Sequence, residues 1–219
     1  MEAFANGGDA SVIYRNIELL RETYPPQAFF ALMNLLSTHD SPRALYDFGY
    51  RDDEAGAEQV ALAKQRLHLA AFFQMTFPGA PAVFYGDEVG VTGGEDPYNR
   101  VTYPWADRSG KPDLALRDEF RRLIHLRREH AVLRHGSIDA PLFIDEHVIV
   151  LLRNDGAEHA IVAMNNDSTA HAVEIDVPAE LHDATLLDAL GHRKLHAQGT
   201  HLKFSIAAHA GRALFATTR

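Results

Sequence analysis

The sequence predicts an α/β fold with parallel strands, followed by a smaller antiparallel β-sandwich. In residues 1–132, amphipathic helical stripes alternate with short apolar runs, which is typical of a parallel sheet or barrel covered on both faces. In residues 133–219 the period changes, and short runs alternate between apolar and polar residues, as half-buried strands do. We therefore expect two domains that meet near residue 132.

The first α/β unit begins with a helix that Asp9 can cap and that the two prolines at 25–26 end. Its apolar side chains lie three or four residues apart on one face: Ile13, Ile17 and Leu20. The apolar run 29–36 then predicts a short buried strand, which stops at the polar pair His39 and Asp40. Polar groups at the carboxyl end of such a strand are where α/β enzymes place their chemistry.

The second unit repeats this order. A helix is predicted over residues 58–75, and a second buried strand over residues 82–85. The helix carries one apolar face: Leu62, Leu69, Phe72 and Phe73. The connection over residues 86–112 is longer than about 15 residues, a length that is uncommon in compact domains unless the loop is functional. Asp113 can cap the last helix, whose stripe follows at helical spacing: Leu116, Phe120, Leu123 and Ile124.

The sandwich prediction rests on alternation and on one turn. Asp155-Gly156 separates the apolar runs 148–152 and 161–164, which is a strong hairpin signal. Residues 173–177 and 202–206 alternate strictly between apolar and polar side chains. Several short strands with turns between them favour a small antiparallel sandwich.

Composition excludes several classes of function. The chain has 219 residues, a net charge of −9 and no cysteine, so it can form no disulfide and no thiolate site. An acidic chain is a poor candidate for nucleic acid or an anionic membrane, and we expect neither as a partner. The 13 histidines lack metal-site spacing, so we expect no metal. The absence of cysteine and of a recognisable signal peptide predicts a cytoplasmic location.

Three motifs within residues 28–105 carry the most specific information. They are NLLSTHD at 34–40, PGAPAVFYGDEVG at 78–90 and GGEDPYNR at 93–100. In this order and spacing they resemble the α-amylase family of glycoside hydrolases, and within it the neopullulanase and cyclomaltodextrinase-like members. The resemblance implies a partial (β/α)8 TIM barrel, made of the last two β/α units in residues 1–132, and a β-sandwich C-terminal domain in residues 133–219.

The resemblance also implies roles for four residues. The family retains configuration at α-glucosidic bonds and needs an Asp nucleophile, a Glu general acid and a second Asp that stabilises the oxocarbenium-like state. Asp40 matches this second Asp, and His39 matches a sugar-contacting His. Asp96 and Arg100 match a pair that contacts the next sugar, and their alternative is a loop-stabilising salt bridge.

This sequence departs from the family pattern in one large respect. The Gly-x-Arg-x-Asp segment that holds the nucleophile and the segment that holds the general acid are both absent from the chain. We therefore expect the C-terminal part of an enzyme that hydrolyses α-1,4 and, as a further option, α-1,6 bonds in maltooligosaccharides or α-glucans. By itself this part is expected to be inactive. No cofactor is expected, and calcium in the parent enzyme cannot be read from these residues.

Two alternatives stay open at this point: a non-catalytic carbohydrate-binding module, and a transglycosylase of the same fold. The adjacent carboxylates Asp87 and Glu88 are interpreted as hydrogen-bonding groups of the barrel end, because neighbours at a strand end point in different directions. The acidic segment 52–54 is interpreted as a solvated loop. Two strands of a barrel leave unpaired backbone groups on both sides, so we expect self-association or pairing with a missing N-terminal part.

Overall fold

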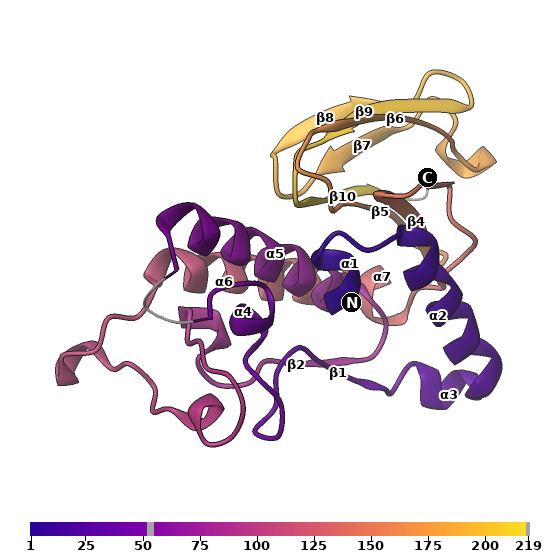
Figure 1. Cartoon of the computed structure of the whole chain (residues 1–219). Coiled ribbons are helices and arrows are strands. Elements are labelled where there is room, and N and C mark those ends of the chain that lie inside the picture. The colour runs from indigo at the N-terminus through magenta and orange to yellow at the C-terminus, as the bar shows by residue number, and fades with distance from the viewer. Residues whose placement is uncertain (52–54, 218–219) are drawn as a thin grey trace.

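Two groups of elements form the structure, a computed structural model that describes residues 1–51 and 55–217 (Figure 1). The first group is mostly helical: α1 (Glu2–Ala5), α2 (Ala10–Thr23), α3 (Pro26–Phe29), β1 (Met33–Leu35), α4 (Ala44–Asp47), α5 (Ala57–Thr76), β2 (Ala80–Ala82), α6 (Leu114–Glu129) and α7 (Val132–His135). Between β2 and α6 lie three 3-10 turns: η1 (Asp87–Val89), η2 (Tyr98–Arg100) and η3 (Ala106–Arg108). The acidic segment 52–54 lies outside the described residues.

The second group consists of antiparallel strands and one 3-10 turn: β3 (Phe143–Ile144), β4 (Val148–Asn154), β5 (Glu158–Asn165), β6 (His171–Asp176), η4 (Ala179–Leu181), β7 (Thr185–Asp188), β8 (Arg193–His196), β9 (His201–Ile206) and β10 (Ala210–Thr217). They form a six-stranded sheet in the order β3-β4-β5-β10-β7-β8 and a two-stranded sheet, β6-β9. The hairpin predicted around the turn at 155–156 is confirmed as β4 and β5. The alternating segments 173–177 and 202–206 lie in or beside β6 and β9, as predicted.

The two strands of the first group are parallel, with Asn34 of β1 opposite Pro81 of β2. Gln74 of α5 fixes both strands, because its Nε2 donates to the carbonyl oxygens of Asn34 at 2.7 Å and of Ala82 at 3.0 Å. The Asn34 side chain donates to the carbonyl oxygen of Pro78 at 2.8 Å. One helix therefore sets where both strands end, and with them the polar segments that follow.

The strand prediction was wrong in two respects. The run 29–36 contains only three strand residues, because Pro26 at a helix start favours one more turn of helix, α3. The strand is also not buried, since Met33 is 64% exposed and Leu35 is 43% exposed. The second strand was expected at 82–85 and is found at Ala80–Ala82, since it extends only as far as its pairing with β1.

The helix predictions were accurate to within a residue or two. Asp9 caps α2, accepting from the Ser11 amide at 2.7 Å, and Asp113 caps α6, accepting from the Leu116 amide at 3.0 Å. The stripe predicted on α6 needs one correction, because Ile124 is half-exposed and Leu126 is buried in its place.

The six-stranded sheet is covered on both faces. One face packs against β6 and β9 through a cluster that includes Val150, Ile161, Ile175, Leu202, Phe204 and Leu214. The opposite face packs against α5 and α6 through a cluster that includes Phe72, Phe120, Leu151, Val162, Met164 and Phe215. Gly211 of β10 shows how close this second contact is, since a Cβ there would lie 2.2 Å from the Phe72 ring. The helices and the sandwich thus share one hydrophobic core.

Two buried arginines lie where the helices meet the sheet. Arg127 of α6 donates to the carbonyl oxygens of Met75 and Phe77, both at 2.8 Å, at the end of α5. Arg153 of β4 donates to the carbonyl oxygens of Thr76 and, at 2.8 Å, of Gly136. Carbonyl groups at helix C-termini have no intrahelical partner, so the two guanidinium groups satisfy groups that would otherwise be buried and unpaired.

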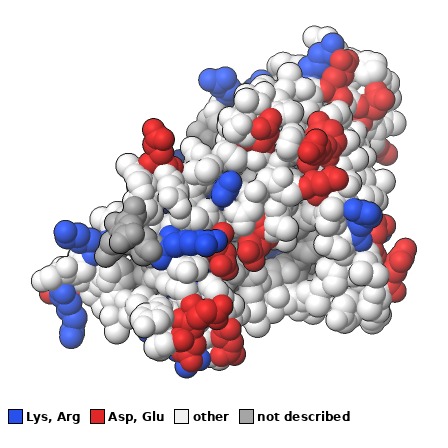
Figure 2. All heavy atoms as spheres, in the orientation of Figure 1, with Lys and Arg blue, Asp and Glu red and all other residues white. Residues whose placement is uncertain are grey.

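The surface agrees with the acidic composition. On the face shown in Figure 2, acidic side chains gather over the sandwich at the upper right, and basic side chains are scattered. Within the part of the chain that the structure describes, no helix has both the length and the apolar character that a membrane span requires.

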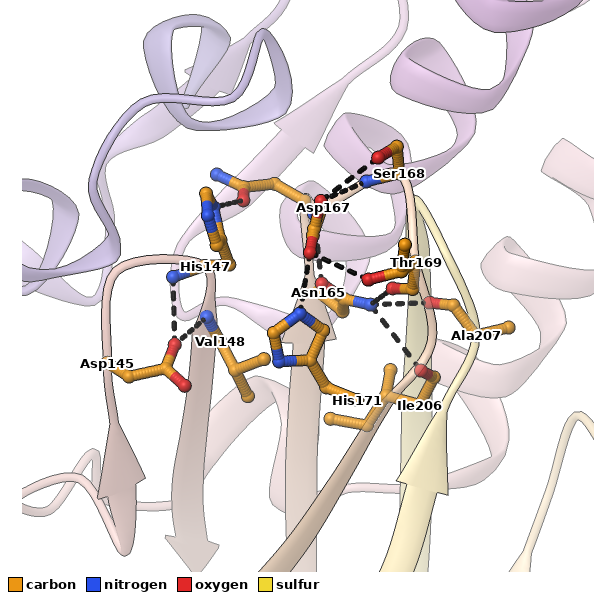
Figure 3. Close-up of polar contacts among 11 residues, drawn as sticks. Asp145, His147, Val148, Asn165, Asp167, Ser168, Thr169, His171, Ile206 and Ala207 are labelled. Carbon is orange, nitrogen blue, oxygen red and sulfur yellow. Dashed lines mark hydrogen bonds and ion pairs between the residues drawn. The ribbon is translucent and has the colours of Figure 1, made fainter.

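A polar cluster fixes the turn that carries the chain from the six-stranded sheet to β6 (Figure 3). The Asp167 carboxylate accepts from His171 Nε2 at 2.7 Å, from Thr169 Oγ1 at 2.8 Å and from the Ser168 amide at 2.6 Å. The hydrogen bond from His171, followed by those from Thr169 and Ser168, holds the pKa of Asp167 well below its usual range. Because its partners lie on the turn itself and at the start of β6, this cluster has a structural role in the sandwich.

Candidate functional site

The candidate site begins at the tight turn that follows β1. The Thr38 amide donates to Ser41 Oγ at 3.1 Å, and the Asp40 amide donates to Thr38 Oγ1 at 3.1 Å. These bonds reverse the chain directly after the strand and present the side chains of His39 and Asp40 to solvent. The Asp40 side chain is 71% exposed.

The structure brings the four predicted site residues together, and Arg100 contacts the other three. Arg100 Nη2 lies 3.5 Å from Asp40 Oδ1, and Arg100 Nε lies 3.2 Å from Asp96 Oδ1. Arg100 Nε also donates to the carbonyl oxygen of His39 at 3.0 Å. The imidazole Nε2 of His39 lies 3.1 Å from Asp40 Oδ2. Two loops that are about 60 residues apart in sequence therefore meet at one exposed polar surface.

Asn99 supports the candidate site from beneath, and the sequence reasoning missed it. It is completely buried, and its Nδ2 donates to the carbonyl oxygens of His39 at 2.9 Å and of Ser41 at 2.8 Å. These carbonyl groups flank Asp40 on both sides. Asn99 therefore holds the backbone of Asp40 in place from beneath, and its position next to Arg100 in the third motif was the available signal.

Arg43 is a second residue that was missed. It too is completely buried, and its guanidinium donates from Nε to the carbonyl oxygen of Asn99 at 2.7 Å and from Nη1 to that of Tyr85 at 2.5 Å. The same group lies over the Phe84 ring, 4.1 Å from its centroid. Arg43, three residues beyond the first motif, thus connects the second and third motifs beneath the exposed surface.

Asp87 and Glu88 have separate partners, in agreement with their interpretation as structural groups. Asp87 is buried beside Arg43, with 3.3 Å between its Oδ1 and Arg43 Nη1. Burial raises the pKa of Asp87 to about 6, although a hydrogen bond from Ser37 and the charge of Arg43 oppose this rise. Glu88 instead accepts from the Gly86 amide at 2.8 Å. The two carboxylates therefore do not act on one bond.

The geometry suits the recognition of a neutral polyhydroxylated ligand. Exposed carboxylates accept hydrogen bonds from hydroxyl groups, and a guanidinium donates to them in a fixed planar arrangement. Among the described residues, no group of three or more His, Cys, Asp or Glu side chains is arranged to hold a metal ion.

Several known proteins are similar to this chain, although no protein-family model matches it. The amylopullulanase of Thermoanaerobacter thermohydrosulfuricus is 42% identical over 134 residues, which is 60% of this chain and 9% of that protein. Neopullulanase 2 of Thermoactinomyces vulgaris is 31% identical over 208 residues, which is 89% of this chain and 31% of that protein.

Among solved structures, a cyclomaltodextrinase superposes with a TM-score of 0.73 at 30% identity, over 87% of this chain and 30% of that one. The chain belongs to the α-amylase family of glycoside hydrolases. An Anoxybacillus α-amylase superposes over the whole chain and 45% of its own length with a TM-score of 0.83, but at 20% identity this likeness supports the fold alone. The chain spans less than a third of the length of the curated relatives named above.

Membership of the family confirms the resemblance found in the three motifs. It also supports the broad fold prediction, a mixed α/β part followed by an antiparallel sandwich. The roles of His39, Asp40, Asp96 and Arg100, and the domain boundary at residue 132, stay predictions.

Proposed function

We propose that this chain is the C-terminal part of a retaining α-glucan hydrolase of the neopullulanase or cyclomaltodextrinase type. In this proposal Asp40 stabilises the oxocarbenium-like transition state, and His39, Asp96 and Arg100 bind sugar hydroxyls. The convergence of Asp40 and Asp96 on Arg100 supports the proposal most directly. The nucleophile and the general acid would come from sequence outside this chain.

The open edge of β1 supports the proposal that the barrel is incomplete. Residues 1–132 would form the last two β/α units of a (β/α)8 barrel, and residues 133–219 the C-terminal domain. An apolar groove of about 410 Å3 lies between α2 and β1, and its lining includes Val12, Leu35 and Phe73. A neighbouring barrel strand would pair with the open edge of β1 and cover this groove.

The proposed reaction can be tested by product release and binding together. We expect the purified chain to release no reducing sugar from maltotriose or pullulan, and calorimetry to detect binding of maltoheptaose. Arg100→Ala should weaken this binding about tenfold, since a charged hydrogen-bond donor is removed. Arg15→Ala, at an exposed position of α2, is the matched control. Sugar release that Asp40→Asn abolishes would show that the chain forms a complete site. It would refute the proposal that the nucleophile lies outside this chain.

A non-catalytic carbohydrate-binding module is the second candidate. It is favoured by one observation, the exposure of the charged side chains: Arg100, Asp40 and Asp96 are 46%, 71% and 55% exposed, as on an open binding surface rather than in an enclosed reaction centre. The two candidates differ in what Asp40 does. In a binding module Asp40→Asn would keep the affinity for maltoheptaose, because an amide still accepts hydrogen bonds from hydroxyls. If Asp40 instead stabilises positive charge, the Asp40→Asn variant would lose affinity for a cationic sugar mimic.

A further inference from the structure

The long loop between β2 and α6 carries a concentration of exposed aromatic side chains. Tyr85, Tyr98 and Trp105 are 42%, 71% and 58% exposed. The same loop supplies Asp96 and Arg100 to the candidate site. In Figure 1 this loop, magenta to pink, projects away from α5 and α6.

Tyr103 and Trp105 form one aromatic surface within this loop. Their ring centroids lie 4.5 Å apart, and the ring planes are tilted by 43°. A groove of about 680 Å3 adjoins them, and its polar lining comes from Thr102, Asp107 and Arg108. An apolar floor with hydroxyl, carboxylate and guanidinium groups at its rim is typical of a small-molecule site rather than of a protein core.

The backbone holds this aromatic surface in shape. The Trp105 amide donates to the carbonyl oxygen of Tyr103 at 2.9 Å, and the amides of Arg108 and Gly110 donate to the Trp105 carbonyl oxygen at 3.0 and 2.9 Å. Gly110 packs so closely that a Cβ would lie 2.3 Å from the carbonyl carbon of Pro104. The loop backbone therefore fixes the aromatic surface of Tyr103 and Trp105, which we call the platform.

Glu88 connects the platform to the turn that also supports the candidate site. Desolvation and then the nearby charge of Glu88 raise the pKa of the Tyr103 hydroxyl, and the Glu88 carboxylate accepts from the Gly86 amide at 2.8 Å. Its neighbour Asp87 contacts Arg43 beneath the site. The Tyr85 hydroxyl donates to the carbonyl oxygen of Val101 at 2.9 Å, which fixes the stretch of loop between the site and the platform.

We propose that Tyr103 and Trp105 form a second sugar-binding surface, which takes glucose units of the same α-glucan that the candidate site binds. A pyranose ring presents an apolar face of C–H groups with hydroxyls around its edge. The aromatic rings suit that face, and Asp107 and Arg108 suit the hydroxyls. The identity of the sugar rests on the proposed function, whereas the platform rests on its own geometry.

Trp105 reports on this surface directly, because it is the only tryptophan in the chain. In the free protein its fluorescence should be readily quenched by iodide. Saturating maltoheptaose should shift the emission to shorter wavelength and reduce iodide quenching at least about twofold, since a stacked sugar excludes the quencher. Tyr103→Ala should weaken maltoheptaose binding about fivefold. Tyr24→Ala, at another exposed tyrosine, should leave it unchanged.

The outcomes separate this inference from the proposed function. Heat of binding without any change at Trp105 would overturn the second surface and leave the first intact. Shielding of Trp105 together with calorimetric binding that Arg100→Ala does not weaken would support the second surface and contradict the first. Absence of both signals would overturn both. Shielding that rises with protein concentration rather than with maltoheptaose would assign the platform to a contact between copies and overturn its sugar-binding role.

Discussion

Replacement of Asn99 by alanine should loosen the loop that presents Asp40. Asn99 is completely buried and donates two hydrogen bonds, to the carbonyl oxygens of His39 and Ser41. The His39 carbonyl keeps the bond from Arg100, while that of Ser41 keeps no donor among the described residues. Two lost bonds at about 1 kcal/mol each and one partly buried carbonyl left unpaired give a loss of roughly 2–3 kcal/mol in the free energy of unfolding.

Urea denaturation followed by circular dichroism measures this loss, and hydrogen exchange locates it. Exchange of the amides of residues 38–41 should accelerate more than that of α5, because the change acts first on the loop. Asn16→Ala, on the exposed face of α2, is the matched control. An unfolding free energy within about 0.5 kcal/mol of that control, with unchanged exchange at residues 38–41, would refute the role of Asn99.

Three further changes test other parts of the structure. Arg153→Met removes a buried guanidinium from several main-chain carbonyls and should cost about 3–5 kcal/mol of unfolding free energy, measured in urea. Asp87 has a pKa raised to about 6 in the folded state, so its contribution to stability is present below about pH 4 and is lost as the pH rises through 6. Relative to Asp87→Asn, the wild type should lose roughly 2–3 kcal/mol between pH 4 and pH 7, as determined from urea midpoints at each pH. Met33→Lys combined with Leu35→Lys should reduce self-association in analytical ultracentrifugation, because it places charge on an open strand edge.

Each of these expectations has a result that contradicts it. A nearly unchanged free energy of unfolding for Arg153→Met would show that water satisfies the carbonyl groups in place of the guanidinium. Equal pH dependence in the wild type and Asp87→Asn would place the titration elsewhere. An unchanged sedimentation coefficient distribution for the double lysine variant would show that β1 does not mediate association.

The parts of the fold that depend on nearby residues were predictable from the sequence. Asp9 and Asp113 cap their helices through amides two and three residues away, so a local pattern was sufficient. The hairpin at 155–156 was equally local. The extent of β1 was not, because the length of a strand depends on its partners, and β2 pairs with only three of its residues.

The candidate site shows the same division. His39, Asp40, Asp96 and Arg100 could be selected by motif. The supporting role of Asn99 could not, because its two hydrogen bonds reach residues 58 and 60 positions earlier in the chain. A completely buried arginine such as Arg43 also contradicts the usual expectation for charged side chains, and only its carbonyl and aromatic partners explain it.

The sheet that is covered on both faces has a practical consequence for anyone who divides this chain. A fragment that begins at residue 133 would leave Leu151, Val162, Met164 and Phe215 facing water, and would leave the guanidinium of Arg153 without the carbonyl of Thr76. Such a sandwich would not behave as a transferable module, and grafting it onto another enzyme would require a matching helix in place of α5. Cutting at that point would remove one half of a single core.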